Sequence, residues 1–271
     1  MSNTAPTRTQ AERADHTRAR IIDAATREFA SSGLAGARTE RIAEAAGVNK
    51  ALLYYYFQGK EALYTAAIES VAEQMAAASM RVLTLECSPG ERLVRSALQH
   101  FDRIYSQPVF QNLMQQEMIR LRKGESTAMH PLIQKLFRPM GDKMVSLAEE
   151  GIRTGELIKT DPSHLGYATL GPNVFYFLSA PMMRLIADKD PFDVSALEFR
   201  RRAAIEYLGQ ALFTDRANGA AIAERVLATT PMPEHIETAS LLPVLDRPGF
   251  NGKPGKGKRA ADKRQKLKDS R

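Results

Sequence analysis

The stretch TERIAEAAGVNKALLYYYFQGKEAL, residues Thr39–Leu63, contains two short helical patterns separated by a glycine. The first pattern, TERIAEAA, ends before Gly47, a residue type that suits a left-handed turn. The second pattern, KALLYYYF, follows Asn49, which can cap a helix, and a further glycine ends it. Thr39 is expected to cap the first helix in the same way. The stretch therefore predicts two short helices joined by a tight turn.

Three consecutive tyrosines and a phenylalanine in the second helix cannot all face one way, because successive side chains turn by about 100°. If Leu53 is at the centre of the buried face, Tyr56 and Phe57 flank it and pack on the neighbouring helices. The opposite face then presents Lys50, Ala51, Leu52, Tyr54 and Tyr55 to solvent. Outward tyrosines can donate hydrogen bonds to phosphate oxygens or touch thymine methyl groups. The pattern favours a helix-turn-helix whose second helix lies in the major groove of DNA.

Two lysines support this interpretation. Lys50 and Lys60 stand in the first turns of two successive helices, where the helix dipole disfavours a cation. A nearby phosphate would reverse the balance, because it pairs with the lysine and with the free backbone amides. The alternative is that both lysines are solvated and the tyrosines are half-buried packing. Each residue taken singly fits that alternative, and only their joint placement favours DNA.

Composition limits the class of protein. The chain of 271 residues is 44% hydrophobic and 25% charged, which is typical of a globular protein. Its one cysteine, Cys87, can form no internal disulfide, which fits a reducing cytoplasm. The first residues lack the apolar segment of a signal peptide, and the longest apolar stretch, VFYFLSAPMM, is too short to span a bilayer. We expect a cytoplasmic protein without a membrane partner.

The net charge of +7 is concentrated near the ends of the chain. Residues 251–271 hold nine Lys/Arg and two Asp/Glu, which accounts for all of it. Residues 1–60 carry a net charge of +3, and residues 61–250 carry −3. A polyanionic partner therefore fits the two ends of the chain and not its middle.

Apolar residues recur at helical spacing along most of the chain, and no useful strand alternation or internal repeat is found, so we predict an all-α protein. The predicted parts are a disordered arm (1–16), a helix-turn-helix domain (17–63), a helical effector-binding and dimerisation domain (64–215), an irregular extension (216–250) and a disordered basic tail (251–271). The helices expected at about 162–180 and 195–213 are candidates for a dimeric four-helix bundle.

The segment from Arg18 to Leu63 resembles the DNA-binding domain of the TetR family of bacterial transcriptional regulators, whose pattern runs much like the quoted stretch. The resemblance implies an N-terminal three-helix helix-turn-helix domain followed by a helical ligand-binding domain. It also implies a homodimer that binds a palindromic double-stranded operator, as a repressor, and releases it when a small effector binds. Carried over by position, the DNA contacts are Thr39, Lys50, Ala51, Leu52, Tyr54, Tyr55 and Lys60.

Two positions depart from the family pattern. Leu52 stands where threonine is common, so a polar contact is lost and a methyl contact can replace it. Gly59 stands where serine or asparagine often caps the fourth helix, which predicts a weaker cap.

An apolar or aromatic effector needs an apolar pocket. The candidate lining residues are Phe101, Tyr105, Phe110, Met114, Met118, Phe137, Phe175 and Tyr176. For any one of them, a place in the core is the competing interpretation. His100, His130, His164 and Glu117 could add polar groups or metal ligands, but their spacing matches no metal motif, so we expect no metal and no cofactor.

Two other functional classes remain open. No nucleophile–base pairing, phosphate loop or metal spacing supports an enzyme, and Cys87 lacks a neighbouring histidine. The second class is an architectural nucleic-acid binder that uses the basic tail. It predicts sequence-independent binding that survives loss of the helix-turn-helix.

Overall fold

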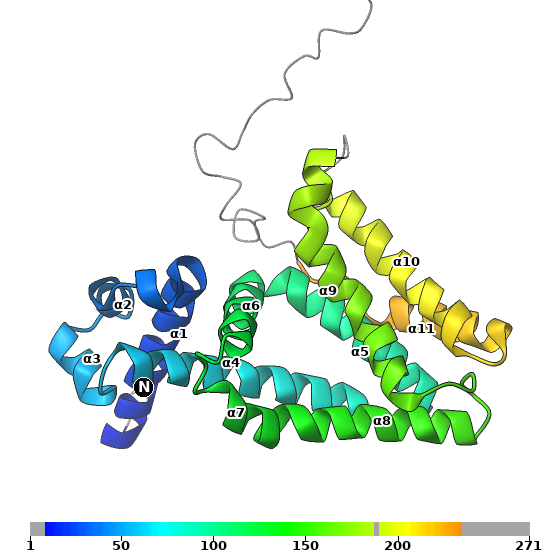
Figure 1. The fold of residues 1–271 in the computed structure, drawn as a ribbon, viewed down its shortest axis with the longest axis horizontal. Coiled ribbons are helices and arrows are strands. Elements are labelled where there is room, and N and C mark those ends of the chain that lie inside the picture. The colour runs from blue at the N-terminus through cyan, green and yellow to red at the C-terminus, as the bar shows by residue number, and fades with distance from the viewer. Residues whose placement is uncertain (1–8, 187–189, 235–271) are drawn as a thin grey trace, which may run out of the picture. The chain divides into compact units, whose positions relative to one another are not determined.

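The computed structural model describes residues 9–186 and 190–234, so the predicted basic tail lies outside the described residues (Figure 1). Over those residues it contains helices, one isolated bridge and no strand, which confirms the predicted all-α class. The helices are α1 (Gln10–Gly36), α2 (Thr39–Ala45), α3 (Lys50–Tyr56), α4 (Lys60–Leu83), α5 (Pro89–Ser106), α6 (Pro108–Arg122), α7 (Met129–Leu132), the π-helix η1 (Ile133–Phe137), α8 (Arg138–Arg153), α9 (Pro162–Ile186), α10 (Val194–Leu212) and α11 (Arg216–Thr229). In this described part, no helix has the length and apolarity that a membrane crossing requires.

The first three helices and the start of α4 share one apolar core, and we call this part the head. Phe29 of α1, Ile42 of α2 and Leu53 of α3 are all fully buried in it. Phe57 is buried beside them, and the half-buried Tyr56 packs against the same core. The predicted packing of the second short helix on its neighbours is confirmed.

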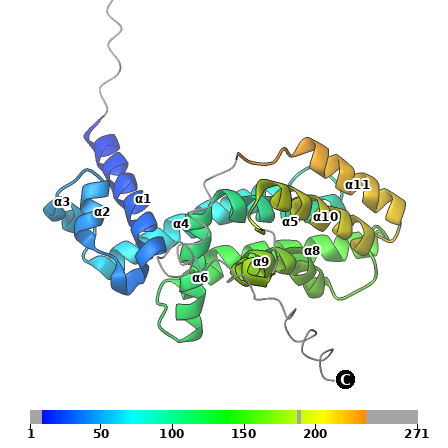
Figure 2. The same cartoon turned by 90° about the horizontal axis from the view of Figure 1, so that it is seen from above.

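The helix α4 connects the head with the rest of the described chain (Figures 1 and 2). Its first half packs on α1, and its later part packs on α5 and α8. A second apolar core contains Leu83 at the end of α4 together with side chains from α5, α8, α9, α10 and α11. The domain limit predicted at residue 63 therefore falls inside a continuous helix.

The N-terminal arm predicted to be disordered over residues 1–16 is helical from Gln10 onward. The reason is a capping box that precedes α1. The Glu12 carboxylate accepts a hydrogen bond of 2.7 Å from the Thr9 amide, and the Thr9 hydroxyl accepts one of 3.3 Å from the Glu12 amide. The predicted disorder is wrong for residues 10–16.

The extension predicted to be irregular over residues 216–250 begins with a regular helix, α11. The Asp215 carboxylate caps it by accepting hydrogen bonds of 2.8 and 3.3 Å from two first-turn amides. Ile222 and Val226 are buried against the second core. The helix is stabilised by these tertiary contacts. Its apolar periodicity in the sequence is weak, so the sequence alone did not predict it.

A pair of glycines lets α10 and α11 approach closely. A Cβ atom built on Gly219 would lie 2.0 Å from the carbonyl oxygen of Gly209. No side chain larger than hydrogen fits at that distance, so the backbones themselves form the contact.

Candidate nucleic-acid interface

The recognition helix α3 is fixed by its cap and its buried face. The Asn49 side-chain oxygen accepts a hydrogen bond of 2.7 Å from the Leu52 amide, so the predicted cap is confirmed. Leu53 is fully buried beneath the helix. The opposite face is therefore held toward solvent, with Tyr55 81% exposed and Tyr54 42% exposed.

The other predicted DNA contacts differ in accessibility. Lys50 and Ala51 are exposed on the same face of α3. Leu52 and Lys60 are half-buried. Thr39 is only 8% exposed, so it is the least accessible of these residues.

Thr39 does not cap α2, contrary to the prediction. The helix begins at Thr39 itself, and its N-cap is Arg38, which forms no side-chain cap. The Thr39 hydroxyl lies 3.3 Å from the Tyr54 hydroxyl, at hydrogen-bond distance. Thr39 therefore joins α2 to the recognition helix and orients Tyr54.

Glu40 is a member of this site that the sequence did not reveal. Its carboxylate forms an ion pair with the Lys50 ammonium, and both side chains are at least half exposed. Their hydrogen bond raises the pKa of Lys50 and lowers the pKa of Glu40. The ammonium also lies 5.8 Å from the centre of the Tyr54 ring. No spacing rule predicts this pair, because only the folded turn brings the two residues together.

Arg20 braces the turn between α2 and α3, which was also not predicted. Its guanidinium donates hydrogen bonds to the carbonyl oxygens of Ala46 and Gly47. Gly47 has a φ of 63°, which confirms the predicted left-handed turn. A Cβ atom on Gly47 would lie 2.5 Å from the Arg20 guanidinium. The positive φ and this close contact both favour glycine at position 47.

Lys60 begins α4 beside the end of α1. Its ammonium donates a hydrogen bond of 3.1 Å to the carbonyl oxygen of Ala35. Gly59 precedes it with a φ of 144° and supplies no side-chain cap, as the departure from the family pattern predicted. The first amides of this 24-residue helix therefore form a positive terminus next to an ammonium group.

The eight predicted effector contacts are spread over different parts of the described chain. Phe101 and Tyr105 are each 1% exposed and belong to the interior. The ring of Phe101 lies 6.3 Å from that of Tyr176. Met118 and Phe175 are 57% and 67% exposed, so they point away from the interior.

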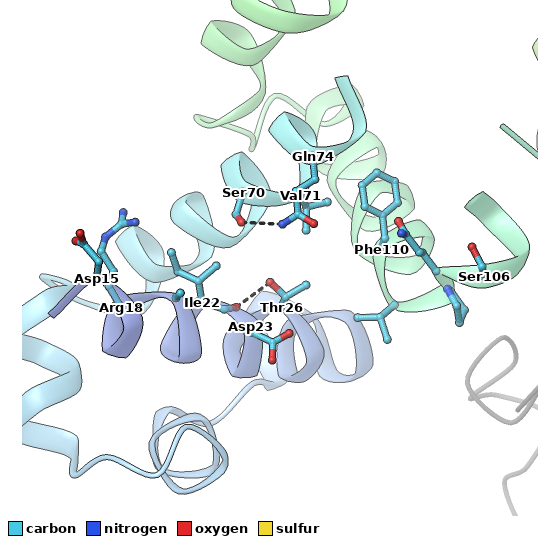
Figure 3. A pocket seen from close by; sticks show the side chains of 14 residues that line it. Asp15, Arg18, Ile22, Asp23, Thr26, Ser70, Val71, Gln74, Ser106 and Phe110 are labelled. Atoms are coloured by element: carbon cyan, nitrogen blue, oxygen red, sulfur yellow. Dashed lines mark hydrogen bonds between the residues drawn. The ribbon is translucent and has the colours of Figure 1, made fainter. Parts of the chain in front are cut away.

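Of the remaining three candidates, two line separate cavities and the third packs against an apolar core. Phe110 lines a cleft of about 790 Å³ that separates α1 from α4 and ends at the start of α6 (Figure 3). Ile22 of α1 and Val71 of α4 line the same cleft. Phe137 lines a smaller cavity of about 110 Å³ bordered by α4, α5, α8 and α9. Met114 packs against the core of the head.

The possible metal ligands are also dispersed. Within residues 9–186 and 190–234, no group of three or more His, Cys, Asp or Glu side chains could hold a metal ion. Glu117 is engaged by Tyr64 and Arg120.

Comparison with known proteins places this interface in a family. Residues 21–67 match the model of the bacterial regulatory proteins, tetR family. The chain is 28% identical over 166 residues to the HTH-type transcriptional regulator RutR of Escherichia coli (strain K12), which covers 61% of this chain and 76% of that protein. It is 49% identical over 53 residues to the HTH-type transcriptional repressor SCO4008 of Streptomyces coelicolor, which covers 20% and 28% of the two chains.

A solved structure has the same fold. The transcriptional regulator of the TetR/AcrR family from Thermobifida fusca aligns with a TM-score of 0.54 and 24% identity, over 70% of this chain and 95% of that one. The matched family segment contains the quoted helix-turn-helix and both glycines that shape its turns. Residues 21–67 match the helix-turn-helix domain of the tetR family, and the relatives found support a TetR-family transcriptional regulator.

Proposed function

We propose that this regulator is a repressor that binds a palindromic operator as a dimer and releases it when a small effector binds. The observation that carries the proposal is the outward face of α3, where Tyr55 is 81% exposed above the fully buried Leu53. Exposing a large aromatic side chain at such a rigid position suits contact with base edges and sugars. Ala51 and Tyr55 are the proposed base-reading residues, while Thr39 and Lys60 contact phosphates.

A second copy of the chain is the proposed partner for α9 and α10. These helices expose large apolar side chains, each more than 60% accessible: Tyr167, Phe175, Leu178, Leu185, Ile186, Phe199 and Tyr207. An apolar surface of this kind favours burial against another protein surface. In a symmetric dimer, two recognition helices about 34–36 Å apart would fit successive major grooves, which requires a palindromic site.

The effector response is proposed to pass through α6, which contacts α1 in the head as well as α4 and α5. Gln116 of α6 donates a hydrogen bond of 2.8 Å to the carbonyl oxygen of Ala30 in α1. Phe110, in the first turn of α6, lines the cleft between α1 and α4 (Figure 3). An effector that moves α6 would therefore change the angle between α1 and α4, and with it the spacing of the two recognition helices.

Operator selection followed by light scattering tests the proposal. Random DNA fragments that the full chain retains should converge on a palindrome, and the complex should have the mass of two chains on one site. A monomer at micromolar concentration with DNA bound would refute the dimer. Linkage provides the test of the response: an effector that weakens operator binding must bind less tightly, by the same factor, when operator is saturating.

A further inference from the structure

One buried charged side chain forms no ion pair with any residue that the structure describes. Five charged side chains are buried among the described residues: Glu91, Asp102, Arg103, Glu117 and Arg201. Four of these form ion pairs with nitrogen–oxygen distances of 3.4 Å or less. Arg103 is the exception within the described chain. Its neighbour in sequence, Asp102, is paired with Arg201 at 2.7 Å.

The surroundings of Arg103 are polar, and among residues 9–186 and 190–234 no carboxylate forms an ion pair with it. Its guanidinium donates a hydrogen bond of 3.2 Å to the Ser79 hydroxyl and lies 5.9 Å from the centre of the Phe110 ring. Burial lowers the pKa of Arg103 to about 10, and no carboxylate opposes that effect. The side chain is still charged at neutral pH. An uncompensated cation in this position is unfavourable, and an anionic ligand would relieve the cost.

Arg103 borders the inner cavity of about 110 Å³, which has both polar and apolar lining residues. Helix α5 contributes Ser96, His100 and Arg103, while α8 contributes Met140 and Met144. The Nδ1 atom of His100 is buried without a hydrogen-bond partner. Burial, then Arg103, lowers the pKa of His100 to about 4, so its imidazole is neutral at neutral pH and Arg103 is the charged group of this lining. No Asp or Glu is among the residues that line this cavity.

We infer that this cavity binds a small apolar or aromatic carboxylate, with its carboxylate on the Arg103 guanidinium and its body against the methionines of α8. Guanidinium and carboxylate groups match in a planar, two-bond geometry, and methionines adapt to apolar ligands of varied shape. The volume is far below the roughly 300 Å³ at which pockets for drug-sized molecules begin, so the ligand is of benzoate size. This inference rests on the proposed effector response and names its chemical class.

The position of Arg103 explains how such a ligand would act. Its guanidinium lies 5.9 Å from the centre of the Phe110 ring, and Phe110 lines the cleft between α1 and α4. Arg103 also borders a separate cleft of about 510 Å³ between α4 and α5, together with Arg81. A carboxylate bound in the inner cavity draws the guanidinium toward α8, away from Phe110 at the start of α6.

Calorimetric titration of the full chain tests the inference with benzoate and hexanoate as probes and benzamide and hexanamide as neutral controls. We expect each acid to bind at least tenfold more tightly than its amide. Arg103→Gln should weaken acid binding at least tenfold and leave amide binding unchanged. Arg81→Gln, which removes the same charge from the outer cleft, should change neither. Met144→Trp should block acids and amides alike by filling the cavity.

Three results would overturn the inference: equal affinity for acid and amide, wild-type acid binding by Arg103→Gln, or no carboxylate binding at millimolar concentration. A structural role for Arg103 would instead lower the melting temperature of the ligand-free Arg103→Gln protein, whereas a ligand-binding role leaves it unchanged or raised. Operator binding, measured by fluorescence anisotropy, separates the two proposals. If the acid binds through Arg103 and operator affinity stays constant, the carboxylate site stands and the effector response fails.

Discussion

Tyr64 in α4 donates a hydrogen bond of 2.7 Å to the buried carboxylate of Glu117 in α6. Ser126 donates to the second carboxylate oxygen, and the Arg120 guanidinium lies 3.4 Å from the first. The Tyr64 ring also meets the ring of Phe29 in α1 edge to face, with centroids 5.0 Å apart. Burial, then the hydrogen bond with Glu117, raises the pKa of Tyr64, so its hydroxyl remains a donor. One side chain thus links the head to the helix proposed to transmit the effector response.

We expect Tyr64→Phe to lower the free energy of unfolding by about 1–3 kcal/mol, because the buried Glu117 carboxylate loses a donor that water cannot replace. Urea denaturation measures this loss. Tyr55→Phe is the matched control: its hydroxyl is on a side chain 81% exposed, so the change should stay within about 0.5 kcal/mol. Equal stability of the two variants would show that the buried hydrogen bond contributes nothing.

Lys60→Ala and Tyr55→Ala should affect DNA binding differently. Lys60 lies at the start of α4, outside the reading face, so its loss should weaken binding to all sequences about equally. Tyr55 projects from the centre of α3, so its loss should also alter base preference. Operator selection with each variant distinguishes these effects. A changed consensus for Lys60→Ala together with an unchanged one for Tyr55→Ala would reverse the assignment.

Glu40→Gln should strengthen DNA binding. The Glu40 carboxylate holds the Lys50 ammonium in the free protein and would lie near the phosphates in the complex. Neutralising it frees the lysine and removes a repulsive charge, so affinity should rise severalfold at low salt, with a steeper dependence on salt concentration. Glu73→Gln is the control, because it breaks the exposed pair of Glu73 with Lys135, away from the head, and changes the net charge equally. Similar gains in both variants would mean that only net charge matters.

The sequence predicted the head well because its signals are local. Asn49 and Gly47 each act on their own backbone, and the 100° turn per residue decides which tyrosines face outward. The interior position of Leu53 and the exposure of Tyr55 follow from that geometry alone. These features required no knowledge of the other helices.

The sequence could not predict features that depend on distant partners. The Glu40–Lys50 pair, the Arg20 brace and the helix α11 all exist because folding brings separate segments together. The effector residues stay a prediction for the same reason: aromatic and methionine side chains suit a core as well as a cavity, and periodicity does not distinguish them. The uncompensated Arg103 could not be recognised from the sequence either, because its partners are defined only by the fold.

The basic tail gives the last prediction. Residues 251–271 lie outside the described residues, and they carry nine Lys/Arg against two Asp/Glu. If these cations neutralise phosphates beside the operator, each neutralised phosphate adds about 0.9 to the slope of log affinity against log salt concentration. Deleting 251–271 should then flatten the slope and weaken specific and non-specific binding alike, while the preferred operator stays the same.

The control for this deletion keeps the length of the chain and replaces the nine Lys/Arg of the tail with Gln. It should reproduce the flatter slope, because counterion release depends on charge and not on chain length. A slope that stays constant in both variants would show that the tail takes no part in DNA binding.

An architectural binder that uses the tail predicts a different result. The double variant Tyr54→Ala, Tyr55→Ala would keep its DNA affinity, because the tail alone would supply it. We expect that double variant to lose operator binding while it retains the salt-dependent, non-specific component.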